Sequence, residues 1–188
     1  RSLVHGDDFA VLGDQEAIDA FEAMLKTRYE LKKTGNLGFD PGDDTSVTFL
    51  NRVISVDGTD RPRSVTYEPD ARHAQIIVQE LFLEKANGAE TPAEKKSADK
   101  QLADSKTALL GEQEKKTYRS CVMRASYLAQ DDPSIGEAVK NLARYMSNPN
   151  YANWEALRRL ARYLIRYPMT ANVMKEQSPP TAIKSYVD

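Results

Sequence analysis

The stretch RSLVHGDDFAVLG, residues 1–13, places two short apolar runs on either side of a polar segment. The runs SLV and FAVL predict two short strands, and HGDD between them predicts the turn that joins them. Gly6 is the residue of this turn that adopts a positive φ at little cost. The stretch therefore predicts a β-hairpin whose tip presents the carboxylates of Asp7 and Asp8.

Two neighbouring carboxylates at an exposed turn offer the hard oxygen ligands that Mg²⁺ prefers. Enzymes that join nucleotides use such carboxylates to hold a triphosphate and a primer end together on metal ions. Glycine and aspartate are also common residues of ordinary turns. The pair Asp7–Asp8 taken alone therefore leaves two alternatives open, a metal site and a plain hairpin turn.

The composition of the 188 residues argues against several classes of protein. No apolar run approaches the length that spans a membrane, and no signal peptide is recognisable. The single cysteine, Cys121, excludes an internal disulfide framework and is expected to be a buried apolar residue. The two histidines, His5 and His73, leave little room for a zinc site.

The net charge of −2 does not indicate a nucleic-acid-binding protein, but the charge is unevenly distributed. Residues 118–168 contain eight Lys or Arg against four Asp or Glu. This local excess is compatible with a phosphate-binding face and equally with a solvated helix face. Arg158, Arg162 and Arg166 recur every four residues and would share one face of a helix.

Periodicity predicts most of the elements. Residues 14–31 predict a helix with Asp14 as its N-cap. Residues 47–70 alternate and turn at DGTD, which predicts a second hairpin. Three amphipathic helices are expected within residues 117–167, separated by Pro133 and Pro149.

The region between the second hairpin and these helices divides into two parts. Residues 71–83 predict a short helix that buries Ile76, Ile77, Leu81 and Phe82. Residues 84–116 are polar and predict a linker or a mobile insertion. Hairpin, helix, hairpin and a helical part, in that order, indicate an α+β fold rather than an alternating parallel sheet.

The chain contains, in order, VHGDDFAVLG, FEAMLKTRYELKKTGNLG, VTFLNRVISVDG, YEPDARHAQIIVQELFL, a later TP, and a long stretch from YRSCVMRASYLAQ to ALRRLARYLIRYP. In this order the stretches resemble the C-terminal part of the reverse transcriptase of copia-type long-terminal-repeat retrotransposons. The first resembles the catalytic hairpin, the third resembles the strand pair that grips the primer, and the last is similar to the family's most recognisable segment. The resemblance covers nearly the whole chain.

The resemblance implies a division of the chain into four parts. Residues 1–70 would be a partial palm with the catalytic GDD hairpin and the primer-grip hairpin. Residues 71–117 would be a thumb helix and a polar linker, and residues 118–168 the helical thumb and connection. Residues 169–188 would be a linker and the first strand of a truncated ribonuclease H domain, in which SYVD makes Asp188 the first ribonuclease H carboxylate.

The resemblance also implies roles for individual residues. Asp7 and Asp8 would be catalytic, as the main and the auxiliary ligand of Mg²⁺, or of Mn²⁺ in its place, in two-metal nucleotidyl transfer. Asn51 and Arg52 would belong to the primer grip. The nucleic-acid backbone would be followed by Arg158, Arg159, Arg162 and Arg166.

The resemblance implies partners outside this stretch of chain. A third aspartate, the fingers and half of the palm sheet are expected upstream in the same polyprotein, and the rest of ribonuclease H downstream. The complete protein would act on an RNA or DNA primer–template and deoxynucleoside triphosphates, without a membrane. It would do so in a cytoplasmic virus-like particle, or in the nucleus with its DNA product. The isolated fragment is expected to be inactive.

The chain departs from the family pattern at two places. His5 stands where tyrosine is usual, and Asp132-Pro133-Ser134 replaces Arg-Pro-Asp. Two other interpretations remain. GDD alone also fits a viral RNA-dependent RNA polymerase fragment, although YLAQ and LRRLARYL argue against it. The second is a non-enzymatic helical module that binds nucleic acid or a protein and contains GDD by chance.

Overall fold

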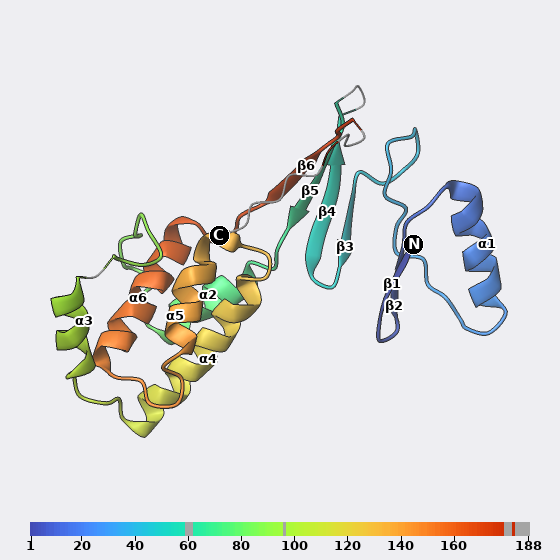
Figure 1. Ribbon diagram of the computed structural model, residues 1–188. Helices are drawn as coiled ribbons and strands as arrows, with labels where there is room; N and C mark the ends of the chain where they lie inside the picture. Colours follow the sequence, from blue (N-terminus) through green and yellow to red (C-terminus); the bar gives the residue numbers. More distant parts are fainter. Residues whose placement is uncertain (59–61, 96, 179–181, 183–188) are drawn as a thin grey trace.

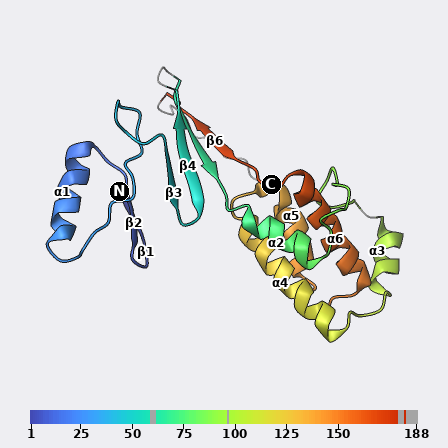
Figure 2. The ribbon, with the colours of Figure 1, turned by 180° about the vertical axis from the view of Figure 1, so that it is seen from behind.

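The computed structural model describes residues 1–58, 62–95, 97–178 and 182 (Figure 1). The fold is α+β, as the order of elements predicts, with two antiparallel sheets and a separate group of helices. The first sheet consists of β1 and β2, and the second has the order β3-β4-β5-β6. In both ribbon views the four-stranded sheet lies between the β1–β2 hairpin with α1 and the group of helices (Figures 1 and 2).

The hairpin predicted at the start of the chain is present. β1 (Ser2–His5) pairs with β2 (Asp8–Val11), and His5 lies opposite Asp8. Gly6 and Asp7 are the two turn residues, and Gly6 has a φ of 63°, a left-handed value that glycine adopts without strain.

The helix predicted over residues 14–31 is shorter in the structure. α1 (Gln15–Lys26) follows Asp14, which has the extended backbone of an N-cap but makes no side-chain capping hydrogen bond. The helix ends before Thr27, whose hydroxyl donates to the carbonyl of Met24 at 2.7 Å. Such local side-chain bonds to the backbone compete with helix continuation.

The second sheet is built from two successive hairpins and one distant strand. β3 (Ser46–Phe49) and β4 (Arg52–Asp57) are joined by a two-residue turn, and β4 pairs in turn with β5 (Ser64–Glu68). Asp57 of the predicted DGTD turn ends β4, and Gly58 after it has a φ of 100°. β6 (Asn172–Lys175) completes the sheet against β5.

β6 is an element that sequence periodicity does not predict. It lies in residues 169–188, where we expected a linker followed by a ribonuclease H strand, and it places Met174 opposite Val65. A four-residue strand whose partner lies more than a hundred positions away has no local signal. The predicted SYVD strand and Asp188 lie outside the described residues.

The helical body consists of α2 (Arg72–Glu80), α3 (Ala98–Ser105), α4 (Glu112–Leu128), α5 (Gly136–Ala143) and α6 (Tyr151–Arg166), with a short 3₁₀ turn η1 (Pro133–Ile135) before α5. Helices α4, α5 and α6 correspond to the three predicted amphipathic helices. Pro133 lies between α4 and α5, and Pro149 lies between α5 and α6. Helices α2, α4, α5 and α6 enclose one apolar core, which includes Ile77, Leu81, Tyr118, Val122, Leu142, Leu157, Leu160 and Leu164.

Two polar side chains are built into this core. The Tyr118 hydroxyl donates to the carbonyl of Leu142 at 2.8 Å, which satisfies a fully buried donor. Cys121 is buried as expected, and burial raises the pKa of its thiol, which keeps the sulfur protonated and unreactive. Among the described residues, no helix combines the length and apolar composition needed to cross a bilayer.

Residues 84–116, predicted to be a linker or mobile insertion, contain ordered structure. α3 begins after Ser97, whose side chain accepts from the backbone N–H of Lys100. Before it, the segment 87–94 lies against α6, and the Ala89 N–H donates to the Arg162 carbonyl at 3.0 Å. This polar segment can pack against α6 because its partners there are arginine side chains.

Phe82 was predicted to be buried in the helix over residues 71–83 and is instead 89% exposed. α2 ends two residues earlier in a Schellman motif, in which the Phe82 N–H donates to Gln79 and the Leu83 N–H donates to Val78. Phe82 has a φ of 54° at the left-handed position of this motif. The chain reversal exposes Phe82 and buries Leu83 in its place.

The left-handed conformation at Phe82 gives a stability prediction. Phe82→Gly should raise the free energy of unfolding by about 1 kcal/mol relative to Phe82→Ala, because only glycine avoids the Cβ clash there. Both variants remove the exposed ring, so their difference isolates the backbone effect. Urea denaturation of the two variants measures it, and equal stability would show that the backbone at residue 82 is not strained.

The first 58 residues contrast with the helical body in their packing. None of them is buried, although they form four strands and one helix. Apolar side chains of the β1–β2 hairpin and α1 are more than one-third exposed, namely Leu3, Val4, Phe9, Leu12 and Met24. Residues 1–58 thus leave these apolar side chains accessible on the hairpin and on α1.

Candidate functional site

The tip of the β1–β2 hairpin places the two predicted carboxylates next to each other in the chain and in solvent. Asp7 is the second turn residue and Asp8 is the first residue of β2, and both are exposed. No residue that the structure describes forms a hydrogen bond or an ion pair with either carboxylate. Both side chains are therefore available to an external cation.

Two carboxylates supply only part of the octahedral set of oxygen ligands that Mg²⁺ requires. Among the described residues, no group of three or more His, Cys, Asp or Glu side chains could hold a metal ion. Substrate phosphates, water and a further carboxylate are the usual remaining ligands of such ions. The described residues therefore offer exposed carboxylates at this tip but not a complete metal site.

The β3–β4 hairpin presents a second tip, formed by Leu50 and Asn51. Both residues are left-handed, with φ of 50° and 62°, as a type I′ turn requires. Asn51 is exposed. In both ribbon views this tip points to the same side of the molecule as the Gly6–Asp7 turn (Figures 1 and 2).

Arg52, predicted to contact a primer with Asn51, is engaged inside the protein. Its guanidinium pairs with the carboxylate of Asp131 in α4's C-terminal extension, with Nη2 at 3.0 Å and Nε at 3.1 Å from Oδ2. The two side chains are only 16% and 10% exposed. The guanidinium also lies over the ring of Tyr127, 5.1 Å from its centroid.

Asp131 connects three strands to the helical body. Its second carboxylate oxygen accepts from the Tyr67 hydroxyl of β5 at 3.1 Å, and its carbonyl accepts from the Asn172 amide of β6 at 2.9 Å. Burial, together with this bond to the carboxylate, raises the pKa of Tyr67. We call the group Arg52, Tyr67, Tyr127, Asp131 and Asn172 the Asp131 junction.

The neighbouring Asp132 is also engaged within the protein. It is buried and accepts from the Ser134 N–H at 2.9 Å, which caps η1, and from the Thr170 hydroxyl at 3.1 Å. Asp131 and Asp132 thus both bind groups of this chain. Sequence analysis did not identify Asp131 as a site residue, because its partners lie 41 to 79 positions away.

Three of the four α6 arginines predicted to follow a nucleic-acid backbone contact the segment 87–94. Arg159 pairs with Glu94 at 2.6 Å, and Arg166 pairs with Glu90 at 3.0 Å. Arg162 donates from Nε to the Asn87 carbonyl at 2.8 Å. These arginines therefore attach the segment 87–94 to α6.

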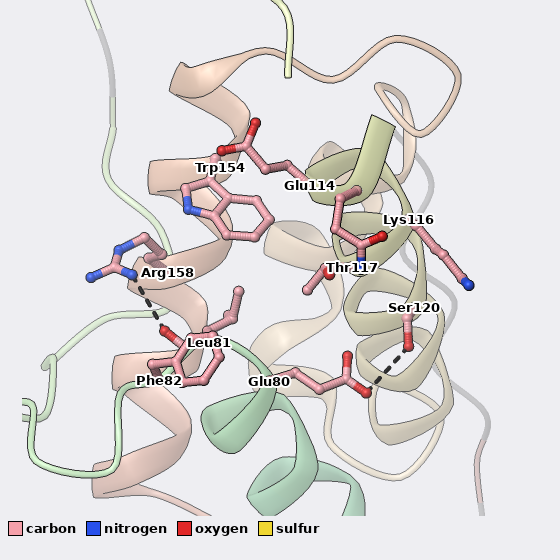
Figure 3. Close-up of a pocket in the computed structure, with 10 residues that line it drawn as sticks. Glu80, Leu81, Phe82, Glu114, Lys116, Thr117, Ser120, Trp154 and Arg158 are labelled. Atoms are coloured by element: carbon pink, nitrogen blue, oxygen red, sulfur yellow. Dashed lines mark hydrogen bonds between the residues drawn. The ribbon is translucent and has the colours of Figure 1, made fainter. Parts of the chain in front are cut away.

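Arg158 differs from the other arginines in its position. Its Nη1 donates to the Leu81 carbonyl at 3.4 Å, and its Nε lies 3.6 Å from Glu155 one helical turn earlier. It borders a groove of about 620 Å³ between α2, α4 and α6, whose apolar lining includes Leu81, Phe82 and Trp154 (Figure 3). Trp154, predicted as core, packs partly against the core and partly lines this groove.

Comparison of the chain with protein-family models, curated proteins and solved structures finds no match. Function is therefore inferred from the residues and their geometry. Of the predicted site residues, the structure leaves Asp7, Asp8 and Asn51 exposed on hairpin tips and gives the five arginines acceptors within the protein.

Proposed function

We propose that the chain is part of an RNA-directed DNA polymerase of a copia-type retrotransposon. The observation that supports this most is the β1–β2 tip, where Asp7 and Asp8 are exposed and bind no other described residue. A buried or ion-paired GDD would favour an ordinary structural turn. The second hairpin tip points to the same side of the molecule, which is compatible with contact of both tips with one primer–template (Figures 1 and 2).

Asp7 would be the main metal ligand and Asp8 the auxiliary one. Bound Mg²⁺, or Mn²⁺ in its place, would supply Lewis-acid activation of the primer hydroxyl and charge stabilisation of the leaving pyrophosphate. The contribution of the protein would be positioning, because one hairpin turn carries both carboxylates. The exposed Asn51 and the backbone of the Leu50–Asn51 turn would contact the primer end.

The complete polyprotein would provide the rest of the site. The third aspartate, the fingers and the remaining palm strands would pack on the exposed apolar surface of the β1–β2 hairpin and α1, represented by Leu3, Val4 and Phe9. Burial of such a surface is favourable by about 25 cal/mol per Å². Downstream, Asp188 would open the ribonuclease H domain of the same polyprotein.

In this proposal only some of the α6 arginines of the thumb would contact a nucleic-acid backbone. Arg159 and Arg162 already bind the segment 87–94. The side chains of Arg158 and Arg166 are 36% and 50% exposed, compared with 29% for Arg159. We therefore assign phosphate contact to Arg158 and to Arg166, which also pairs with Glu90, and an attachment role alone to Arg159 and Arg162.

The proposal predicts that the isolated 188-residue chain does not polymerise. With two of the three required carboxylates, it should incorporate no deoxynucleotide into a poly(rA)–oligo(dT) template–primer with Mg²⁺ or Mn²⁺. The complete polyprotein segment, assayed in parallel, should extend the same primer. Incorporation by the isolated chain would contradict the proposed shared site, and inactivity of the complete segment would contradict the proposed function.

A further inference from the structure

The turn that joins β3 and β4 is conformationally costly. Leu50 and Asn51 are consecutive non-glycine residues with φ of 50° and 62°. The left-handed region costs an L-residue roughly 1–2 kcal/mol, and asparagine tolerates it better than leucine does. Conformations of this kind persist only where surrounding contacts hold them.

Arg52 supplies a contact that holds this turn. Its Nη1 donates to the Leu50 carbonyl at 3.4 Å, while Nε and Nη2 of the same guanidinium bind Asp131. The planar guanidinium presents its donors in a fixed arrangement, so the position of Asp131 determines where the Leu50 carbonyl is held. The Tyr127 ring supports the guanidinium at 5.1 Å.

Asp131 is itself fixed by groups from other elements. The Tyr67 hydroxyl binds its Oδ1 at 3.1 Å, and Asn172 binds its carbonyl at 2.9 Å. Its N–H donates to the Leu128 carbonyl at 3.0 Å, which ties it to the end of α4. A continuous series of contacts therefore runs from the helical body through Asp131 and Arg52 to the Leu50–Asn51 turn.

We propose that Asp131 is a positioning residue, which acts through Arg52 to hold the Leu50–Asn51 turn at a fixed place relative to the helical body. This inference rests on the proposed function for its consequence, namely correct placement of a primer end. Arg52 then serves the turn from within the protein and does not touch the primer. The exposed Asn51 side chain and the turn backbone remain as the primer-contacting groups.

The test uses Asp131→Asn and Arg52→Lys in the 188-residue chain, with Asp57→Asn as the matched control. Asp57 is an exposed aspartate at the other end of β4. NMR shifts of the Leu50 and Asn51 Cα atoms report their left-handed conformations. We expect Asp131→Asn to move both shifts toward random-coil values and to leave Tyr118 and Leu160 shifts in the core unchanged, whereas Asp57→Asn should move none of them.

Arg52→Lys separates the ion pair with Asp131 from the hydrogen bond to the Leu50 carbonyl. The ammonium retains a charge pair with Asp131 but lacks the fork that reaches the Leu50 carbonyl at the same time. The variant should therefore stay folded and still lose the left-handed shifts of the turn. Unchanged shifts in both Arg52→Lys and folded Asp131→Asn would overturn the proposed positioning.

The complete polyprotein segment tests the functional consequence. Asp131→Asn and Arg52→Lys should lower kcat of primer extension at least tenfold while primer–template affinity stays within twofold, and Asp57→Asn should change neither. Altered turn shifts with an unchanged kcat would overturn the positioning role. If the wild-type segment does not polymerise, the proposed function is refuted. Altered turn shifts in the variants would then still support the role of Asp131 in fixing the conformation of the turn.

Discussion

Asp7→Asn in the complete polyprotein segment is expected to reduce Mg²⁺-dependent primer extension by about a thousandfold or more. The amide removes the negative charge that would bind both metal ions and leaves the size and exposure of the side chain nearly unchanged. Because Asp7 lies in a solvent-exposed turn and binds no other described residue, the substitution should not affect folding. Steady-state extension of an RNA-templated primer measures the effect, with primer–template binding measured separately.

Asp14→Asn is the matched control for this experiment. Asp14 is also exposed, lies shortly after the hairpin and makes no side-chain capping hydrogen bond, so its substitution should leave extension unchanged. Asp8→Asn should lower extension less than Asp7→Asn, as an auxiliary ligand would. Normal extension by the Asp7→Asn enzyme would exclude both polymerase interpretations and favour an interaction module.

Arg52→Ala and Asp131→Ala should each lower the free energy of unfolding by about 3 kcal/mol. Each substitution leaves a charged partner largely buried, since the two side chains are 16% and 10% exposed, and Asp131 also holds Tyr67. Urea denaturation of the isolated chain measures this effect. The double variant should lose less than the sum of the single losses, because the second substitution removes the charge that the first left without its partner.

The ion pair Lys26–Glu22 on α1 provides the comparison. Its Lys26 side chain is 57% exposed, and exposed pairs of this spacing contribute about 0.3–0.5 kcal/mol. Lys26→Ala should therefore change stability by less than 1 kcal/mol. Equal, small effects at Arg52 and Lys26 would show that the Asp131 junction does not stabilise the fold.

Elements with strong local patterns were predictable from the sequence. The two-residue turn at Gly6 follows from the conformational freedom of glycine between two apolar runs. α4 and α6 follow from helical periodicity, and Leu157, Leu160 and Leu164 are buried as that periodicity predicts. In each case the signal lies within one turn or one helix.

Contacts between distant residues were not predictable in the same way. Arg52 and Asp131 are separated by 79 positions, and nothing in the local pattern of either shows that the two meet. The same applies to Arg159, predicted as phosphate-binding, since its charge fits Glu94 as well as a phosphate. Residue type indicates that a cation needs an anion, and only the tertiary structure shows which anion it has.

Phe82 illustrates a third kind of limit. Helical spacing predicted that it would be buried, but α2 ends two residues earlier and Phe82 takes the left-handed position of a Schellman motif. That motif usually has glycine or asparagine at the left-handed position, and neither is present here to signal the helix end. Phenylalanine at this position is atypical, so the sequence alone does not show that α2 ends there.

The most direct measurement of the central claim is the sequence of the coding DNA on both sides of this stretch. The account predicts one continuous reading frame, with a strand-borne aspartate roughly half a domain upstream of Asp7 and further acidic strands after Asp188. Stop codons close to either side, or a different domain there, would contradict it. The catalytic roles of Asp7, Asp8 and Asp188 would then be withdrawn.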